Sequence, residues 1–327
     1  MTNTIQKTLF AIFALLLFTA APVTGQITGE SGTQVVVYNP LAWNRTDIVD
    51  MPSPFCGENV KTVTVADGTA TYPAQIVADR IIFTARNVPA LDYKIFRLIK
   101  SDKPAATSIK TTNDYIENEY FRVKFDLSKG IIKRIYDKIN KRVVASQTGV
   151  LQIVINKQIM DLDPDETEVL EIGPTRAMAR LEHTYGKSSF VQDVVLYEGV
   201  PRIDIKLTAY LQQQAALEVT FPTALSCPKA IFDIPCRTNA QKWIDLSEDK
   251  YGISILNYSK YTCSVTNNIV HILIPTDLSG QRIYEAAYSI YPHSGNCSTG
   301  FTSHCAVELN NPLSIVARSC KISTNTQ

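Results

Sequence analysis

Four histidines are the first candidates for metal chemistry in this chain of 327 residues. A catalytic zinc ion usually takes three protein ligands, commonly His or carboxylate side chains. His183, His271, His293 and His304 are scattered over the second half of the chain, and their spacing builds no such set. The sequence therefore predicts no metal site and no cofactor for this chain.

A second candidate is the acidic run Asp161–Glu168, in which three Asp residues stand at alternate positions as they do at the start of a calcium loop. That loop needs Gly at its sixth position and Glu at its twelfth, where this chain has Glu166 and Ile172. We interpret the run as a solvated acidic loop.

Four residues in the last third could contact a carbohydrate: Trp243, Asp245, Tyr288 and His293. An aromatic plane suits the C–H face of a sugar ring, and His293 ends a predicted strand where it could add a polar contact. Each also has a structural alternative: Trp243 and Tyr288 as core residues, Asp245 as a turn cap, and His293 bonded to turn backbone. Because large aromatic residues dominate cores, the structural alternatives are favoured.

The elements that must position these residues are short β-strands. Alternating or β-branched runs such as Gln34–Tyr38, Arg80–Thr84 and Arg202–Leu207 recur between Gly, Pro, Asn and Asp, which favours sandwich architectures. Hydrophobic residues make up 45% of the chain, enough for a sizeable core, and the net charge of +1 argues against nucleic-acid partners and acidic membranes.

The domain organisation follows from composition. A polar stretch without aromatic residues, Lys100–Thr112, is typical of a linker. We therefore expect a small β-sandwich over 26–103, a linker over 104–112 and a larger β unit over 113–327.

The first 25 residues are predicted to be a signal peptide, with Lys7 before an apolar run, Leu9–Ala21, that is short for a membrane span. A retained anchor is the alternative. We expect a secreted or lumenal protein, with no membrane association after cleavage.

Export agrees with seven cysteines in the mature part, six of them after residue 226. Cys227–Cys236 and Cys297–Cys305 would close short disulfide loops, although the sequence leaves the pairing open and the count is odd. Three glycosylation sequons occur, at Asn44, Asn257 and Asn296.

Five stretches, in order, carry a resemblance to a known family: VVVYNPLAWNRTDIVDMP (Val35–Pro52), NVPALDYKIFRL (Asn87–Leu98), YIENEYFRVKFDLSKGIIKRIYDKINKRVV (Tyr115–Val144), QKWIDLSEDKYGISILNYSKY (Gln241–Tyr261) and YEAAYSIYPHSG (Tyr284–Gly295). They are similar to the region downstream of the catalytic domain in glycoside hydrolase family 38, the α-mannosidases. The resemblance implies a small β domain followed by a galactose-mutarotase-like β supersandwich. The strand pattern gives the same all-β class.

The resemblance also implies what is missing. The family binds zinc in a preceding catalytic domain, partly through a His-x-Asp pair, and none of the four His here is followed by such an Asp. A retaining glycosidase also needs two carboxyl groups about 5 Å apart, and no stretch here suggests them. Inside the matched region, Leu278–Arg282 replaces the family's Asp-x-Gly-x-His, and the segment before Trp243 is compressed.

The resulting hypothesis is a chain that acts in glycan and mannose metabolism as a non-catalytic scaffold, inactive by itself. It would bind mannose-containing glycans or dock a separate catalytic chain. The alternatives are a hydrolase subunit whose catalytic domain is on another chain, and a truncated fragment without function.

Overall fold

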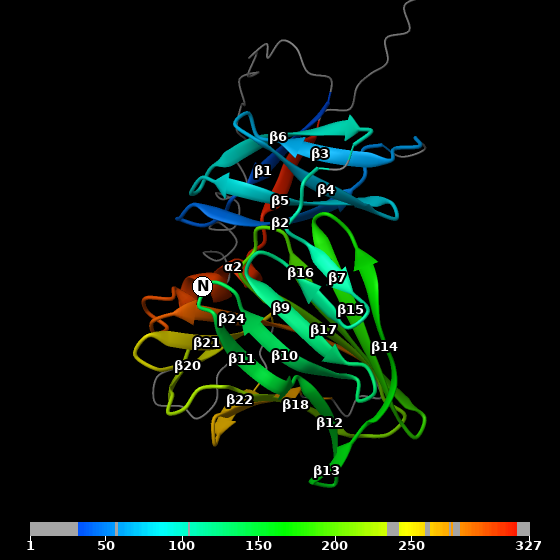
Figure 1. Ribbon diagram of the computed structural model, residues 1–327, viewed down its shortest axis with the longest axis vertical. Helices are drawn as coiled ribbons and strands as arrows, with labels where there is room; N and C mark the ends of the chain where they lie inside the picture. Colours follow the sequence, from blue (N-terminus) through cyan, green and yellow to red (C-terminus); the bar gives the residue numbers. More distant parts are fainter. Residues whose placement is uncertain are drawn as a thin grey trace, which may run out of the picture. The chain divides into compact units, whose positions relative to one another are not determined.

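The computed structural model describes residues 32–55, 58–103, 105–233, 242–258, 262–274, 276 and 282–318 (Figure 1). The predicted signal peptide lies outside these residues. Within them, strands dominate and the regular helix is α2 (Thr302–Asn310). The prediction of an all-β chain is confirmed. No helix of the described part is both long enough and apolar enough to span a membrane.

The first sheet has seven antiparallel strands around a core of its own, to which Val35, Phe83, Phe96 and Leu98 contribute. Its strands, in spatial order, are β2 (Arg45–Pro52), β5 (Arg80–Val88), β4 (Thr71–Val77), β3 (Thr62–Ala66), β6 (Tyr93–Ser101), β1 (Thr33–Tyr38) and β25 (Ser314–Arg318). Along β2 buried and more exposed residues alternate, as expected for a strand with one face on a core.

The last strand differs from the sequence interpretation, which placed all residues after 112 in the larger unit. β25 pairs with β1, with Val37 opposite Ile315, and Leu313 packs into the first core. This pairing satisfies backbone groups of β1 that would otherwise stand at an open sheet edge. The predicted linker is also partly ordered, because it contains β7 (Lys110–Thr112) and the buried side chain of Ile109.

The larger part contains three sheets around a second core. One sheet has the order β11 (Arg142–Thr148), β10 (Ile131–Asp137), β9 (Phe121–Asp126), β8 (Tyr115–Glu117) and β7. Another has β13 (Gln158–Asp161), β12 (Val150–Ile155), β18 (Ala216–Pro222), β23 (Ile269–Ile274) and β22 (Thr262–Thr266). The third has eight strands: β14 (Asp163–Ile172), β15 (Arg176–Tyr185), β16 (Ser188–Tyr197), β17 (Ile203–Tyr210), β24 (Ile283–Ser294), β21 (Tyr251–Asn257), β20 (Trp243–Ser247) and β19 (Lys229–Phe232).

The eight-stranded sheet has one exposed edge and one enclosed strand. The acidic run interpreted as a loop continues as the edge strand β14, paired with β15 and exposed along much of its length. At the other side, every residue of β21 is buried, because the sheet core covers one face and α2 packs against the strand. Polar residues of β21 are therefore enclosed and need partners within the protein.

A buried imidazole holds the turn between β9 and β10. His183 of β15 is 5% exposed, and a Cβ placed on Gly130 would come within 2.7 Å of its Nε2 atom. Gly130 also has φ +63°, a conformation that favours glycine. Burial lowers the pKa of His183, while backbone contacts at Gly130 and Lys129 act in the opposite direction.

This histidine predicts a loss of stability in mild acid. Its folded-state pKa lies below the unfolded value near 6.5, so below that pH the unfolded chain takes up a proton that the folded chain excludes. The free energy of unfolding should fall as the pH drops from 7 towards 5.5, by no more than about 1.4 kcal/mol per pH unit for this one proton. Urea unfolding of wild type and His183→Gln at both pH values measures it. An equal fall in both proteins would contradict the assignment.

Candidate functional site

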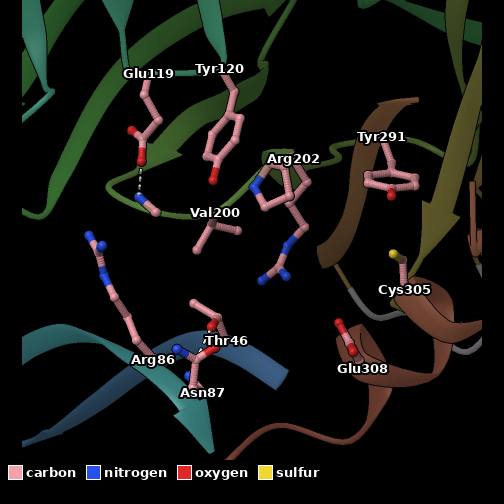
Figure 2. Close-up of a pocket in the computed structure, with 12 residues that line it drawn as sticks. Thr46, Arg86, Asn87, Glu119, Tyr120, Val200, Arg202, Tyr291, Cys305 and Glu308 are labelled. Atoms are coloured by element: carbon pink, nitrogen blue, oxygen red, sulfur yellow. Dashed lines mark hydrogen bonds between the residues drawn. The ribbon is translucent and has the colours of Figure 1, made fainter. Parts of the chain in front are cut away.

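A cavity of about 440 Å³ opens where the ends of β2 and β5 meet the loop before β9, the β16–β17 turn, β24 and α2 (Figure 2). Its first wall comes from the seven-stranded sheet. Arg86 lies over the ring of Tyr72, 4.4 Å from its centroid, and its Nη2 contacts Glu198 Oε1 at 3.2 Å. Its Nε has no hydrogen-bond partner among the described residues. That Nε atom is buried, so a ligand could use only the donors on the exposed part of the side chain, which is 30% exposed.

Asn87 stands beside Arg86 and owes its place to the backbone. It has φ +52°, a left-handed conformation that Asn tolerates better than most residues, and its N–H donates to Thr46 Oγ1 at 3.0 Å. Its side chain is exposed and lines the cavity next to Thr46. An amide and a hydroxyl can both donate and accept, so this wall suits a ligand rich in hydroxyl groups.

The second wall is the loop before β9. Asn118 is fully buried and fixes this loop: its Oδ1 accepts the N–H groups of Tyr120 and Phe121 at 2.9 and 2.8 Å. Glu119 Oε1 accepts the N–H of Gly199 at 2.8 Å, and its other oxygen accepts from Ser108 Oγ. Burial, and then the charge of Glu119, raise the pKa of Tyr120, so its hydroxyl remains a donor at neutral pH.

The third wall consists of Tyr291 on β24 and of Cys305 and Glu308 on α2 (Figure 2). Burial raises the pKa of Glu308, although Trp43 Nε1, which donates to its Oε1 at 2.7 Å, acts in the opposite direction. Burial also raises the pKa of the Cys305 thiol to about 11. The thiol is therefore protonated at neutral pH and is no activated nucleophile.

The floor of the cavity is Arg202, whose charge is already neutralised. Its Nη2 donates to Asp47 Oδ1 and its Nε to Asp204 Oδ1, both at 2.9 Å. Asp47 also pairs with the buried Arg45, and these two arginines keep the pKa of its carboxyl low against the effect of burial. Arg202 and Glu308 also line a second cavity of about 490 Å³ that extends over the outer face of the eight-stranded sheet.

The structure brings together two of the four predicted carbohydrate contacts, Asp245 and His293. His293 Nε2 lies 2.7 Å from Asp245 Oδ1. Asp245 is on β20 and His293 is on β24, and β21 lies between these two strands. Ser254 Oγ donates to the same carboxylate oxygen at 2.8 Å and lies 2.7 Å from Thr302 Oγ1. All four side chains are buried, so they form an internal polar cluster and do not face a ligand directly.

Two glycines make room for the imidazole of His293. A Cβ on Gly252 or on Gly300 would come within 2.3 Å of the ring, and neither has a positive φ, so close approach is what requires glycine here. The ring of Tyr291 stacks on His293, with centroids 5.5 Å apart and planes at 30°. Tyr291 lines the cavity of Figure 2, so the Asp245–His293 cluster supports one of its walls.

The two predicted aromatic contacts are not in this cavity. Tyr288 is 1% exposed, meets Phe221 edge-on at 5.8 Å and accepts a hydrogen bond from Gln192 Nε2 at 3.3 Å. Trp243 is half-buried at the start of β20, opposite Leu256. For Tyr288 the structure matches the core alternative, because strand alternation turns it away from the face that carries Ser289 and Tyr291. Trp243 lies outside both hydrophobic cores.

The predicted glycosylation sites differ in exposure, and the predicted disulfide pairs are not formed among the described residues. Asn44 and Asn296 are exposed, whereas Asn257 is fully buried and its Nδ2 contacts Cys263 Sγ at 3.2 Å. The folded chain therefore does not present Asn257 for glycosylation. Cys297 and Cys305, a predicted candidate pair, are both free thiols, and Cys236, the suggested partner of Cys227, lies outside the described residues.

The zinc of the family does not fit the residues described. No group of three or more His, Cys, Asp or Glu side chains in this part of the chain is placed to hold a metal ion. The four imidazoles lie in separate places: His271 contacts Glu218, His293 contacts Asp245, His183 packs against Gly130 and His304 packs against Trp43.

The cavity residues that sequence reasoning missed are Arg86, Asn87, Glu119 and Tyr120. Asn87 begins one of the stretches that resemble the family, and Glu119 lies inside another. In both places the residue looks like an ordinary strand end. The signal was local: an Asn before Val-Pro and an Asn-Glu-Tyr between two strands both indicate special turns. Their convergence comes from tertiary packing, which no local pattern contains.

Comparison with known proteins agrees with this architecture. Residues 116–274 match the family model of the glycosyl hydrolases family 38 C-terminal domain. Alpha-mannosidase 2C1 of Mus musculus is 23% identical over 90% of this chain, and that of Homo sapiens 22% over the same share. The chain spans 31% of the length of each.

A solved family 38 protein from Enterococcus faecalis shares the fold, with a TM-score of 0.67, 13% identity and coverage of 89% of this chain and 48% of that one. An α-mannosidase from the same organism gives a TM-score of 0.67 at 14% identity over 89% of this chain and 46% of its own. These agreements confirm the resemblance seen in the sequence. Residues 116–274 of the chain are therefore similar to the C-terminal domain of the family 38 glycosyl hydrolases.

Proposed function

We propose that this chain acts in α-mannoside metabolism by holding a mannose-containing glycan in the cavity of Figure 2, while a separate catalytic chain supplies the groups that break the bond. The observation that carries the proposal is the chemistry of the cavity walls. Arg86, Asn87 and Thr46 face Glu119 and Tyr120 across about 440 Å³, which gives donors, acceptors and an aromatic ring in one space.

The balance of charge favours an uncharged ligand. Arg202 is neutralised by Asp47 and Asp204, and Arg86 is paired with Glu198. A neutral, polyhydroxylated molecule can use the remaining hydrogen-bond capacity without introducing an unpaired charge. The curated relatives carry the name α-mannosidase, which supports an α-mannoside as the saccharide.

Binding tests the first half of the proposal. Methyl α-mannoside titrated into the pure chain, followed by tryptophan and tyrosine fluorescence, should bind with a Kd on the order of 1 mM, about −4 kcal/mol. Asn87→Gly keeps the left-handed backbone and removes the amide, so one hydrogen bond worth about 1 kcal/mol is lost and the Kd should rise about fivefold.

Asn267→Gly is the matched control, because Asn267 also has a positive φ, 50°, in the exposed β22–β23 turn and does not line the cavity. Its Kd should equal that of wild type. No saturation at about 10 mM sugar, or equal effects of the two substitutions, would reject the cavity as the saccharide site.

Hydrolysis tests the second half. The pure chain should release no nitrophenol from 4-nitrophenyl α-mannoside, with or without added zinc. The described residues place no group of three side chains to hold a metal ion, and the two carboxyl groups that line the cavity already accept hydrogen bonds, Glu119 from Gly199 and Glu308 from Trp43. Metal-dependent release by the pure chain would show that the bond-breaking groups belong to it. That result would leave the binding measurement intact and reject the separate catalytic chain.

A further inference from the structure

A groove of about 310 Å³ lies on the five-stranded sheet that contains β9 and β10. It shares no lining residue with the saccharide cavity. Its lining is Arg122 and Lys124 of β9 with Arg134 and Tyr136 of β10. The lining therefore consists of three cationic side chains and one aromatic ring, and it includes no carboxylate. Such a lining suits an anion.

The strand register brings like charges into direct opposition. Arg134 pairs with Lys124 across the two strands, and Tyr136 pairs with Arg122. The pairing shifts between Ile132 and Arg134, so a bulge places Arg134, in place of Lys133, opposite Lys124. Like charges directly opposite each other destabilise a sheet, so this arrangement carries a local cost that a bound anion would remove.

Neighbouring acids offset only part of this charge. Glu117 is shared between Arg122 and Lys138, whose Nζ lies 2.8 Å from Glu117 Oε1. Lys124 Nζ contacts Asp114 Oδ2 at 3.0 Å. Arg134 has no carboxylate within ion-pair distance in the described part of the chain, and its guanidinium lies 5.7 Å from the Tyr136 ring centroid. The groove therefore keeps a positive excess centred on Arg134.

We propose that this groove binds a phosphate or sulfate monoester. The guanidinium of Arg134 can present paired N–H donors whose geometry matches two oxygens of such an anion. Arg122, whose Nε is held by Glu117, and Lys124, which contacts Asp114, add positive charge at the sides of the groove. The ring of Tyr136 offers an apolar surface for the organic part of the ester. This site is independent of the saccharide cavity, because the two lie on different elements.

The test is calorimetric titration of the pure chain with glucose 6-phosphate at low ionic strength, with inorganic phosphate and glucose as comparison probes. The ester should bind with a Kd below about 1 mM, more tightly than inorganic phosphate, and should weaken as salt is added. Arg134→Gln should raise the Kd about tenfold. Lys133→Gln, which removes the same charge from the neighbouring exposed position of the same strand, should leave it within about twofold.

Three results would overturn the proposal: no heat of binding at about 10 mM ester, equal affinities of the Arg134→Gln and Lys133→Gln variants, or tighter binding of inorganic phosphate than of the ester. Loss of folding does not confuse the outcome, because removing one member of a like-charged pair should not lower the melting temperature. Asn87→Gly should bind the ester as wild type does, so the two sites succeed or fail separately.

Discussion

Replacing His293 with alanine should lower the free energy of unfolding by about 3–5 kcal/mol, which is the range for deleting a large buried ring together with the partner of a buried charged group. The side chains of His293 and Asp245 are 2% and 0% exposed, and their contact at 2.7 Å is sealed between two glycines. The substitution leaves the Asp245 carboxylate with Ser254 as its remaining donor and leaves a void beside Tyr291. Urea unfolding monitored by circular dichroism measures the loss.

His271→Ala is the control, because His271 also contacts a carboxylate, Glu218, but its side chain is 29% exposed. Water replaces that contact, so the cost should stay near 1 kcal/mol. A double-mutant cycle with Asp245→Asn should give a coupling of at least about 1 kcal/mol. Equal losses for His293→Ala and His271→Ala would mean that burial of the pair contributes nothing.

Arg202→Met should cost about 3 kcal/mol, because it removes the shared partner of two carboxylates from a site where its own side chain is 13% exposed. The value lies at the lower end of the range for broken buried pairs, since Asp47 keeps Arg45 and Asp204 still accepts from Ser289 Oγ at 2.6 Å. Urea unfolding midpoints of wild type and variant give the difference.

Arg80→Met provides the comparison, because Arg80 pairs with Asp50 while both side chains are more than 40% exposed. Such a pair contributes less than about 1 kcal/mol. If both variants lose the same stability, the Arg202 network is no more than a surface ion pair. If Arg202→Met is as stable as wild type, the cost of removing the three charges of this network from water equals the stabilisation from their attraction.

The sequence predicted the parts of this molecule that local pattern controls. Period-two alternation identified β17, and the resemblance located β20 and β24 with Asp245 and His293 on them. It did not predict that these two residues meet, because their contact depends on the order β24–β21–β20, in which β21 lies between the other two strands. Strand order is set by tertiary packing and has no local signal.

The cavity was beyond sequence reasoning for a related reason. Arg86, Glu119 and Glu308 come from three segments that look like ordinary polar strand ends and a helix surface. These segments come together because two residues in turns between strands bind distant parts of the chain. Arg202 donates to Asp47, and Asn118 donates to the carbonyl oxygen of Tyr197. The interpretation of the acidic run as a loop was wrong because a polar edge strand and a solvated loop have the same composition.

The partner of β1 on its outer side has a consequence for how the protein is made. Residues 314–318 leave the ribosome only after every other strand in the described part of the chain has emerged. They nevertheless complete the seven-stranded sheet, which contains β1, the first strand to emerge. Until then, the backbone of Thr33–Tyr38 offers an open row of donors and acceptors, during the whole time that the larger core is collapsing. Nascent chains halted before residue 314 should thus be the species most prone to mispairing and aggregation, and most dependent on chaperones.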